Sequence, residues 1–259
     1  MSPALSIPSG LETAVEPAQV AALRLAVVVP TLNEEGNIGA LIERARTALD
    51  LEKIPFEIIV VDDDSSDQTA ARVEAIAAQD SRVRLIVRKG ERGLSGAILD
   101  GWRASTADVY GVIDADLQHP PEVLPSLYKA IVSGRDLAIG SRYAQGGGTG
   151  NWNFVRKFLS SAAIWASWPL FRRGVRAHDP MAGLFMVRRE CVENIPFQRQ
   201  GFKLLLDVLV RSRVRSLAEV PIDFGLRTAD ESKANMGVGI DYARLLVRLY
   251  ARKLGIGRG

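Results

Sequence analysis

An acidic segment near the middle of the chain has the composition of a binding site for a divalent cation. It reads DADLQH and directly follows the apolar run 109–113. Side chains two residues apart in an extended segment share a face, so we expect Asp114, Asp116 and Gln118 to present oxygen atoms together. Such oxygens suit Mg²⁺ or Mn²⁺, and Mg²⁺ usually takes only one or two carboxylates plus the phosphates of a substrate. His119 is either a further ligand or a surface residue of the turn before the prolines.

A second acidic cluster follows an earlier apolar run, Glu57–Val61. It contains three adjacent carboxylates, Asp62, Asp63 and Asp64, which repel one another, so a role in folding alone explains them poorly. Asp67 is instead a candidate cap of the helix that follows. We expect at least one of the three to accept hydrogen bonds from the N–H groups of a base or from ribose hydroxyls.

Basic residues in later segments supply the opposite charge. Ser141 and Arg142 come at the end of the apolar run 137–141. The farther candidates are Arg156, Lys203, Arg227 and Lys233. Each of these alone is most often a solvated surface charge. Together they fit a site for a pyrophosphate and a second phosphate, because arginine holds phosphate oxygens with two N–H groups.

The formal net charge of +3 hides an uneven distribution of charge along the chain. Residues 1–149 contain 14 basic and 21 acidic residues, whereas residues 150–259 contain 19 basic and 9 acidic residues. This contrast predicts a metal-dependent acidic site in the first part and a surface facing phosphates or a membrane in the second. The alternative is ordinary solvated charge on both parts.

The elements that must position these residues alternate between strand and helix. Continuous apolar runs predict strands over residues 25–29, 57–61, 83–87, 109–113 and 137–141. Apolar residues at helical spacing predict helices over residues 38–49, 69–79, 94–104 and 122–132. Continuous apolar strands are typical of sheets covered on both faces, and their alternation with helices implies parallel strands joined by right-handed crossovers. Ligands bind at the carboxyl ends of such strands, which is where both acidic clusters and Arg142 lie.

The pattern changes after residue 145, where a cluster of glycines marks a loop. Residues 151–173 then hold three of the four tryptophans between flanking arginines and lysines. Further strands are predicted over residues 183–188 and 217–220, and further helices over residues 202–211 and 240–253. We expect a flexible tail, residues 1–22, and a single α/β domain, residues 23–259, whose segment 145–178 faces a substrate and a membrane.

Composition excludes several classes of protein. Of the 259 residues, 47% are hydrophobic and 24% are charged, so the chain can fill a core and is not disordered as a whole. Cys191 is the single cysteine, which excludes an intrachain disulfide and cysteine-pair zinc sites and favours a reducing compartment. The sequence has neither the run of roughly 18 apolar residues that spans a bilayer nor a signal-peptide pattern. We expect a protein that is not integral but touches a membrane.

Several segments match, in the same order, a known family of glycosyltransferases. They are PTLNE (30–34), VDDDSSDQT (61–69), GLSGAILDG (93–101), DADLQHPPE (114–122), IGSRY (139–143), HDPMAG (178–183), GFKLLLD (201–207) and VPIDFGLRTADESK (220–233). Over about residues 24–250 the chain therefore resembles dolichyl- and polyprenyl-phosphate mannose synthases. This resemblance implies the GT-A fold of nucleotide-diphospho-sugar transferases, with a mostly parallel central sheet flanked by helices and with interfacial amphipathic helices. It also implies an inverting glycosyltransferase that depends on Mg²⁺ or Mn²⁺.

The resemblance implies roles for individual residues, with Asp116 and Arg142 as the catalytic ones. The nucleoside pocket would be formed by Pro30, Leu32, Glu34, Val61 and Asp63. The pyrophosphate turn would be formed by Asp114, Ala115 and Asp116, and the metal ligands would be Asp114, Asp116 and Gln118. The sugar nucleotide would be gripped by Arg142, Lys203, Arg227 and Lys233, and the acceptor phosphate by Ser141, Arg142 and Arg156. Two residues depart from the family pattern: Leu32 replaces a tyrosine, which leaves the base open, and Gln68 replaces a glycine in a turn.

The implied reaction is transfer of mannose from GDP-mannose to a polyprenyl monophosphate, which gives polyprenyl-phosphate mannose with inversion. The nucleophile is then a phosphate monoester with a second pKa of about 6, so no general base is needed. One alternative is transfer of glucose or another sugar from a UDP-sugar to the same lipid. A non-enzymatic membrane adapter with a dead site is a third reading, and the intact Asp114, Asp116, Gln118 and Arg142 argue against it.

The implied partners are the two substrates, the surface of a membrane on its cytoplasmic face and a small integral-membrane subunit, with no nucleic acid. Residues 151–173 suit peripheral binding, because their aromatic side chains can lie among headgroups between flanking basic residues. The basic helix predicted over residues 240–253 is a second candidate. For both segments the alternative is packing on the core or on another copy of the chain.

Overall fold

The computed structural model describes residues 22–148, 166–171, 175–199, 204–223, 245–251 and 253. Four of the predicted site residues, Arg156, Lys203, Arg227 and Lys233, lie outside the described residues. The same holds for most of the predicted N-terminal tail and for most of the aromatic segment 151–173.

The described residues form a seven-stranded sheet in the order β3-β2-β1-β4-β6-β5-β7. Its strands are β1 (Leu25–Thr31), β2 (Phe56–Asp62), β3 (Val83–Val87), β4 (Val109–Val112), β5 (Leu137–Ser141), β6 (Phe185–Arg188) and β7 (Leu217–Pro221). β6 is antiparallel to both of its neighbours, and every other pair of strands is parallel. The prediction of an α/β fold with a mostly parallel sheet is therefore confirmed, with each of the five early strands where its apolar run placed it.

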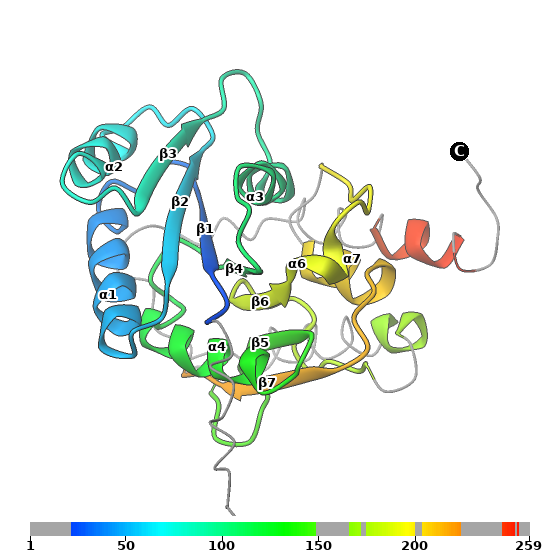
Figure 1. Cartoon of the computed structure of the whole chain (residues 1–259). Coiled ribbons are helices and arrows are strands. Elements are labelled where there is room, and N and C mark those ends of the chain that lie inside the picture. Colours follow the sequence, from blue (N-terminus) through cyan, green and yellow to red (C-terminus); the bar gives the residue numbers. More distant parts are fainter. Residues whose placement is uncertain are drawn as a thin grey trace, which may run out of the picture.

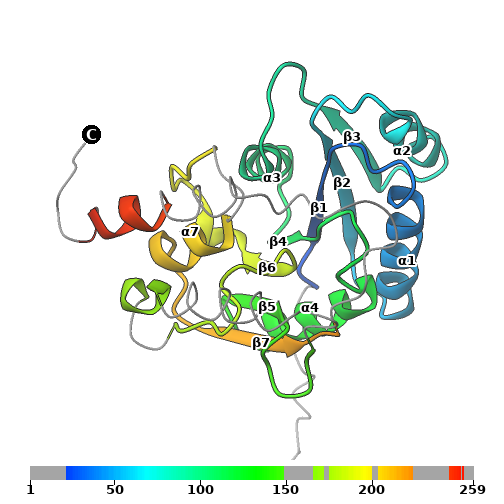
Figure 2. The ribbon, with the colours of Figure 1, turned by 180° about the vertical axis from the view of Figure 1, so that it is seen from behind.

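Helices cover both faces of this sheet (Figures 1 and 2). The helices are α1 (Ile38–Leu51), α2 (Thr69–Ala77), α3 (Leu94–Arg103), α4 (Leu124–Val132), α6 (Arg189–Val192) and α7 (Leu204–Arg211), with short 3-10 turns at Pro121–Val123 and Trp168–Leu170. α1, α2 and α4 pack on one face, and α3, α6 and α7 pack on the other. Side chains of β1 alternate between the two resulting cores, with Val27 on one side and Val28 on the other. Burial on both faces is why these strands are continuously apolar.

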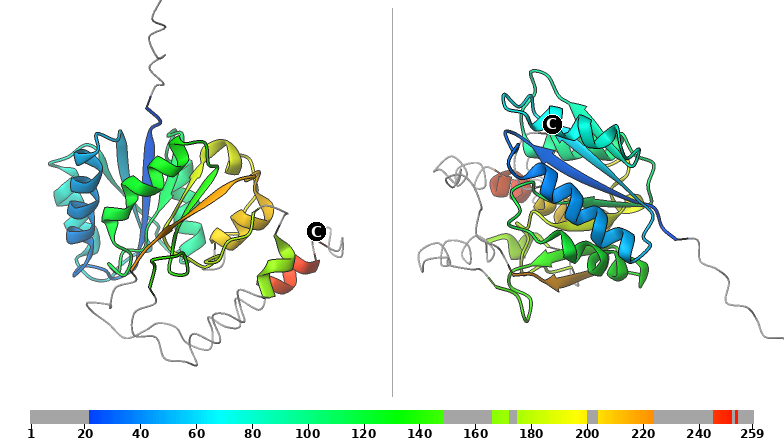
Figure 3. Two further views of the ribbon diagram at one scale, coloured as in Figure 1. Left: turned by 90° about the horizontal axis from the view of Figure 1, so that it is seen from below. Right: turned by 90° about the vertical axis from the view of Figure 1, so that its left-hand side faces the viewer.

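The carboxyl ends of the parallel strands lie together at one end of the sheet, which we call its carboxyl edge. It is opposite the end at which the chain enters β1 (Figure 3, left). Because β1, β2, β4 and β5 all end there, the loops after them carry both acidic clusters and Arg142 to the same edge.

The C-terminal segment packs on the body of the protein beside residues 166–171 (Figure 3, left). The Tyr250 hydroxyl donates a hydrogen bond to the carbonyl of Ala166 at 2.7 Å, and Lys253 Nζ donates to the carbonyl of Pro169. Leu249 is buried, and Leu245, Leu246 and Tyr250 pack against the core formed with α3 and α7. For the described part of the terminal helix, packing on the core is thus the alternative that the structure supports. Within the described residues, no helix is both long and apolar enough to cross a membrane.

Candidate active site

The acidic segment after β4 folds as a turn. Residues 115–116 form the turn, and Leu117 has a φ of 59°, in the left-handed region. The backbone N–H of Gln118 donates to Asp116 Oδ1 at 3.1 Å, which closes an Asx-type turn. The expectation that this segment is extended is therefore wrong. The turn leaves Asp114, Asp116 and Gln118 half-buried at the carboxyl edge of the sheet.

Asp114 packs against the backbone of a second loop. A Cβ built on Gly183 would lie 1.8 Å from Asp114 Oδ2, a distance at which two atoms overlap. The Asp114 carboxylate can therefore occupy its position because residue 183 has no side chain. His119 is buried near this carboxylate, with Nδ1 3.9 Å from Asp114 Oδ2. The interpretation of His119 as a surface residue is wrong, because the turn directs its ring into the protein.

The donor set of this turn fits a small divalent cation. In the part of the chain that the structure describes, no three His, Cys, Asp or Glu side chains converge as a closed metal site. Two half-buried carboxylates and one amide oxygen from a five-residue turn form an open set instead. Hard cations such as Mg²⁺ prefer oxygen ligands and complete their shell with water or substrate phosphates. Asp114, Asp116 and Gln118 are thus chemically suited to hold Mg²⁺ or Mn²⁺.

The acidic cluster after β2 binds neighbouring protein groups. Asp62 accepts hydrogen bonds from Thr31 Oγ1 at 2.8 Å and from the backbone N–H of Ser65 at 2.8 Å, so it fixes the turn between strand and helix. Asp63 Oδ1 pairs with Arg88 Nη1 at 2.7 Å, and Oδ2 accepts from the backbone N–H of Gly93 at 2.7 Å.

Burial raises the pKa of Asp63, and the Gly93 N–H and the Arg88 guanidinium act in the opposite direction. The side chains of Asp63 and Arg88 are each 7% exposed. Asp63 therefore connects the end of β2 to the loop before α3. Arg88 was not among the predicted site residues, because nothing in its local sequence distinguishes it from a surface charge.

The other predicted nucleoside residues lie at the ends of β1 and β2. Pro30 and Val61 are buried partners in neighbouring strands, and Leu32 and Glu34 are half-buried in the loop after β1. That loop is bonded to the loop after β2: the backbone N–H of Asn33 donates to Ser65 Oγ, and the backbone N–H of Ser66 donates to Asn33 Oδ1. The residues predicted for the nucleoside pocket are thus brought together at the carboxyl ends of β1 and β2.

Arg142 is held in a fixed orientation at the end of β5. Its Nε and Nη2 donate to the two oxygens of Asp179 at 2.7 and 2.6 Å, and its backbone N–H donates to Asp179 Oδ2 at 3.1 Å. The Asp179 side chain is fully buried, and that of Arg142 is 9% exposed. Burial acts to lower the pKa of Arg142, but the hydrogen bonds and charge of Asp179 raise it overall, and the charge of Asp114 adds to this. Asp114 also packs on Gly183 of the loop that carries Asp179, so the acidic turn and Arg142 contact the same loop.

Ser141 has a structural contact that sequence reasoning missed. Its side chain is fully buried, and its hydroxyl accepts hydrogen bonds from the backbone N–H groups of Tyr143 and Ala144. The hydroxyl thus shapes the turn that carries Arg142. Asp179 was also missed as a site residue, although the segment HDPMAG that contains it was singled out.

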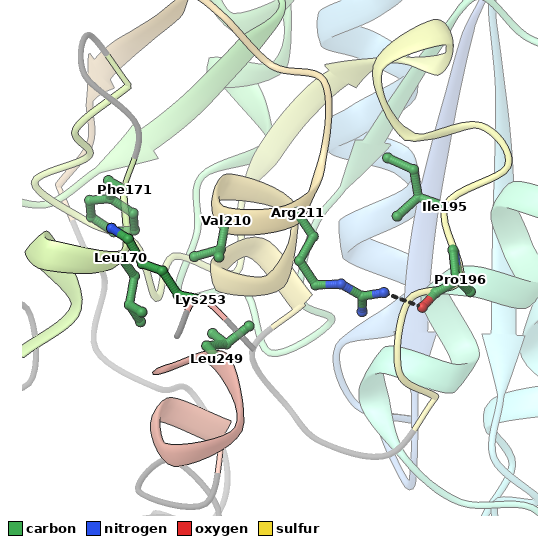
Figure 4. A pocket seen from close by; sticks show the side chains of 8 residues that line it. All are labelled: Leu170, Phe171, Ile195, Pro196, Val210, Arg211, Leu249 and Lys253. Atoms are coloured by element: carbon green, nitrogen blue, oxygen red, sulfur yellow. Dashed lines mark hydrogen bonds between the residues drawn. The ribbon is translucent and has the colours of Figure 1, made fainter. Parts of the chain in front are cut away.

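A pocket with a volume of about 420 Å³ lies on another part of the molecule, beside α7 (Figure 4). Its described lining residues are Leu170, Phe171, Ile195, Pro196, Val210, Arg211, Leu249 and Lys253. Arg211 donates a hydrogen bond to the carbonyl of Pro196 at 2.6 Å and pairs with Asp207. None of the described lining residues belongs to the predicted site, so this pocket is separate from the acidic turn.

Comparison with known proteins identifies the family. The family model described as glycosyl transferase family 2 matches residues 26–196, which include β2–β6, all of β1 but its first residue, and the acidic turn. The chain belongs to glycosyl transferase family 2. This family 2 glycosyltransferase is an enzyme, as the resemblance predicted.

Individual relatives show which members of the family the chain resembles. The chain is 40% identical over 227 residues to the dolichol-phosphate mannosyltransferase of Pyrococcus furiosus, a match that covers 88% of this chain and 64% of that protein. It is 37% identical over 244 residues to the dolichol-phosphate mannosyltransferase of Saccharomyces cerevisiae, with 90% and 89% covered. A polyprenol monophosphomannose synthase of Mycolicibacterium smegmatis is 36% identical over 219 residues, with 81% and 80% covered. The resemblance to polyprenyl-phosphate mannose synthases is therefore confirmed, although the chain spans less than two thirds of the Pyrococcus protein.

Solved structures agree on the fold. The mannosyl-3-phosphoglycerate synthase from Rubrobacter xylanophilus superimposes with a TM-score of 0.69 at 20% identity, covering 91% of this chain and 76% of that one. A glucosyl-3-phosphoglycerate synthase from Mycobacterium tuberculosis, crystallised with Mn²⁺ and UDP-glucose, has a TM-score of 0.66 at 22% identity, covering 92% and 82%. The GT-A fold predicted for this family 2 glycosyltransferase is confirmed.

Proposed function

We propose that the protein transfers mannose from GDP-mannose to a polyprenyl monophosphate and gives polyprenyl-phosphate mannose with inversion. The observation that carries this proposal is that Asp114 of the acidic turn packs on Gly183, in the same loop whose Asp179 orients the cation of Arg142. The carboxylates of the turn suit a cation that meets the diphosphate leaving group, and the guanidinium of Arg142 suits the phosphate of the acceptor. The names of the relatives, which are mannosyltransferases acting on lipid phosphates, support the choice of sugar and acceptor.

The oxygen atoms of Asp114, Asp116 and Gln118 would hold Mg²⁺ or Mn²⁺. When bound, the cation neutralises charge on the diphosphate that departs. The turn fixes the two carboxylates relative to the sheet edge, and Gly183 leaves room for the carboxylate of Asp114. Donor binding also involves Lys203, Arg227 and Lys233 in our proposal, as the match to the family motifs implies.

The acceptor phosphate supplies the nucleophile. One of its oxygens forms a bond to the anomeric carbon while the bond to the diphosphate breaks on the opposite face, so the configuration inverts. A phosphate monoester is largely dianionic at neutral pH, since its second pKa is about 6, and no side chain must remove a proton. Arg142 and Arg156 would orient it, and catalysis then comes from position and charge.

The nucleoside is assigned to the region between the loops after β1 and β2. Pro30, Leu32, Glu34, Val61 and Asp63 are the residues of this proposed pocket. Asp63 is a suitable acceptor for N–H groups of a base, and Arg88 holds its carboxylate in place. Leu32 offers an apolar surface rather than a hydroxyl, which is why a UDP-sugar is tested as the second donor.

The proposed location is the cytoplasmic face of a membrane, reached by peripheral contact or through a small integral-membrane subunit. Two observations support this location. Cys191 is the single cysteine of the sequence and a buried free thiol, and a chain without cysteine pairs suits a reducing compartment. The surplus of basic residues after residue 149 favours contact with anionic lipid headgroups.

A transfer assay with two donors tests this function. The protein is incubated with Mg²⁺, a polyprenyl phosphate and either radiolabelled GDP-mannose or radiolabelled UDP-glucose, and label is counted after extraction into organic solvent. The proposal expects lipid-soluble label from GDP-mannose and little from UDP-glucose. The reverse preference would establish the UDP-sugar alternative, and label from neither donor would contradict the proposed transfer.

A further inference from the structure

Glu219 lies on the edge strand of the sheet and is bonded to a loop of the active site. It belongs to β7, in register with Ile139 of the neighbouring strand β5. Its Oε1 accepts hydrogen bonds from the backbone N–H groups of His178 and Asp179 at 3.0 and 3.1 Å, and its Oε2 pairs with His178 Nδ1. The Glu219 side chain is only 10% exposed, whereas that of His178 is 67% exposed.

The loop that Glu219 holds is the one that orients Arg142. Asp179 follows His178 directly, and its carboxylate receives three N–H donors from Arg142. The position of the Asp179 backbone therefore sets where the guanidinium of Arg142 points. Two successive contacts therefore connect β7 to the site. Glu219 binds the backbone of residue 179, and the Asp179 carboxylate binds Arg142.

The contacts between Arg142 and Asp179 join charged groups in the protein interior, where such contacts are stronger and more directional than at the surface. Arg142 belongs to β5's carboxyl end and Asp179 to the loop before β6, so neither strand alone fixes both. A buried carboxylate that accepts two adjacent backbone N–H groups restricts the rotation of that loop. Supporting residues of this kind commonly change affinity or activity by 10- to 100-fold without touching the ligand.

We propose that Glu219 is a positioning residue for Arg142, acting through the backbone of His178 and Asp179. The essential group is the side-chain oxygen that accepts from the two backbone N–H groups, rather than the imidazole of His178. Without it, Arg142 loses its fixed orientation toward the acceptor phosphate. The effect on acceptor binding rests on the proposed function, whereas the effect on the orientation of Arg142 does not.

A set of variants separates this role from a general loss of stability. Glu219→Ala removes both oxygens. Glu219→Gln keeps one oxygen that can accept from the two backbone N–H groups, and it loses the negative charge. His178→Ala removes the ring but keeps its backbone N–H. Glu57→Ala is the matched control, because Glu57 is also a strand carboxylate that binds a loop, through Ser105 Oγ, but at the amino end of β2.

The first readout is the Nε–H signal of Arg142 in NMR spectra of protein labelled with ¹⁵N-arginine, assigned with Arg142→Lys. In Glu219→Ala we expect this N–H to exchange with water about ten-fold faster, as loss of one hydrogen bond implies. It should remain protected in Glu219→Gln, His178→Ala and Glu57→Ala. Unchanged protection in both Glu219→Ala and Glu219→Asp, whose shorter side chain cannot reach both N–H groups, would overturn the proposal. Equal loss in Glu57→Ala would do the same.

The second readout is transfer kinetics. Glu219→Ala should raise the KM for polyprenyl phosphate about ten-fold and leave the KM for GDP-mannose nearly unchanged, with Glu219→Gln close to wild type. An equal rise in both KM values would contradict a role through Arg142. If the wild-type protein transfers no sugar, the proposed function fails, and the NMR readout still decides the role of Glu219.

Discussion

The carboxylate of Asp114 occupies the space that a side chain on residue 183 would fill, since a Cβ there would lie 1.8 Å from Asp114 Oδ2. The two residues are 69 positions apart in sequence and come from the loops after β4 and before β6. Their contact couples the acidic turn to the loop that holds Arg142. The geometry of the acidic turn therefore depends on a glycine that carries no functional group.

Gly183→Ala should displace the Asp114 carboxylate and lower kcat about 100-fold, because misplacement by about 1 Å can cost that much. It should also weaken Mn²⁺ binding measured by titration calorimetry. Gly39→Ala in α1 is the matched control, since nothing lies within 4 Å of a Cβ at that position. It should leave kcat unchanged and raise the free energy of unfolding by about 1 kcal/mol. Normal activity of Gly183→Ala would show that Asp114 has no strict position.

Asp116→Ala should abolish turnover while leaving the fold intact by circular dichroism, because the carboxylate is half-buried at the sheet edge and outside both cores. Excess EDTA should inhibit the wild-type protein, and added Mg²⁺ or Mn²⁺ should restore its activity. Full activity of Asp116→Ala, or of wild type in EDTA, would be incompatible with the proposed metal role.

Arg156→Ala should raise the KM for polyprenyl phosphate far more than the KM for GDP-mannose, as expected when one phosphate contact is lost. Arg142→Ala should do the same and should also lower stability by about 3–5 kcal/mol, because it leaves Asp179 buried without its partner. Steady-state kinetics and urea unfolding separate the two effects. Equal changes in both KM values for Arg156→Ala would count against an acceptor role.

The acid stability of the protein should depend on Asp80. Hydrogen bonds from Arg82, with a further contribution from Arg46, lower the pKa of Asp80 from 3.8 to about 2. Its contribution to stability is therefore complete well above pH 4 and is lost as the pH falls from about 4 toward 2. The difference in unfolding free energy between wild type and Asp80→Asn should be largest near pH 7 and shrink toward pH 2. A difference that does not vary with pH would show that the ion pairs contribute nothing.

Wild-type protein should float with anionic liposomes at low salt and be released at high salt, because each basic residue near such a surface contributes about 1 kcal/mol. Trp165→Ala should weaken flotation. Truncation after Gly239 should mainly lower the melting temperature, since Leu249 and its neighbours pack on the core. If the wild-type protein stays soluble at low salt, a membrane subunit must recruit it.

Local signals in the sequence were sufficient for the early strands and helices. A continuous apolar run such as residues 25–29 is a local property of the sequence, and it predicts a strand buried on both faces, as the structure has it. The extended reading of residues 114–118 failed because the left-handed φ of Leu117 belongs to a tight turn that the strand pattern does not reveal.

The supporting residues of the site were not predictable in the same way. Asp179 and Glu219 act through partners 37 and 40 residues away, and a contact of that separation leaves no periodic signal in the sequence. Sequence alone identified the groups that touch substrates in the proposed mechanism, whereas the groups that orient them required the fold.

The most direct test of the account is the stoichiometry of the reaction. Purified protein is given Mg²⁺, GDP-mannose and polyprenyl phosphate, and both released GDP and glycosylated lipid are quantified by mass spectrometry, with Asp116→Ala as the inactive control. The account predicts one GDP for each polyprenyl-phosphate mannose formed by wild type and neither product from the variant. Release of GDP without mannosylated lipid, or formation of mannosylated lipid by Asp116→Ala at the wild-type rate, would contradict it.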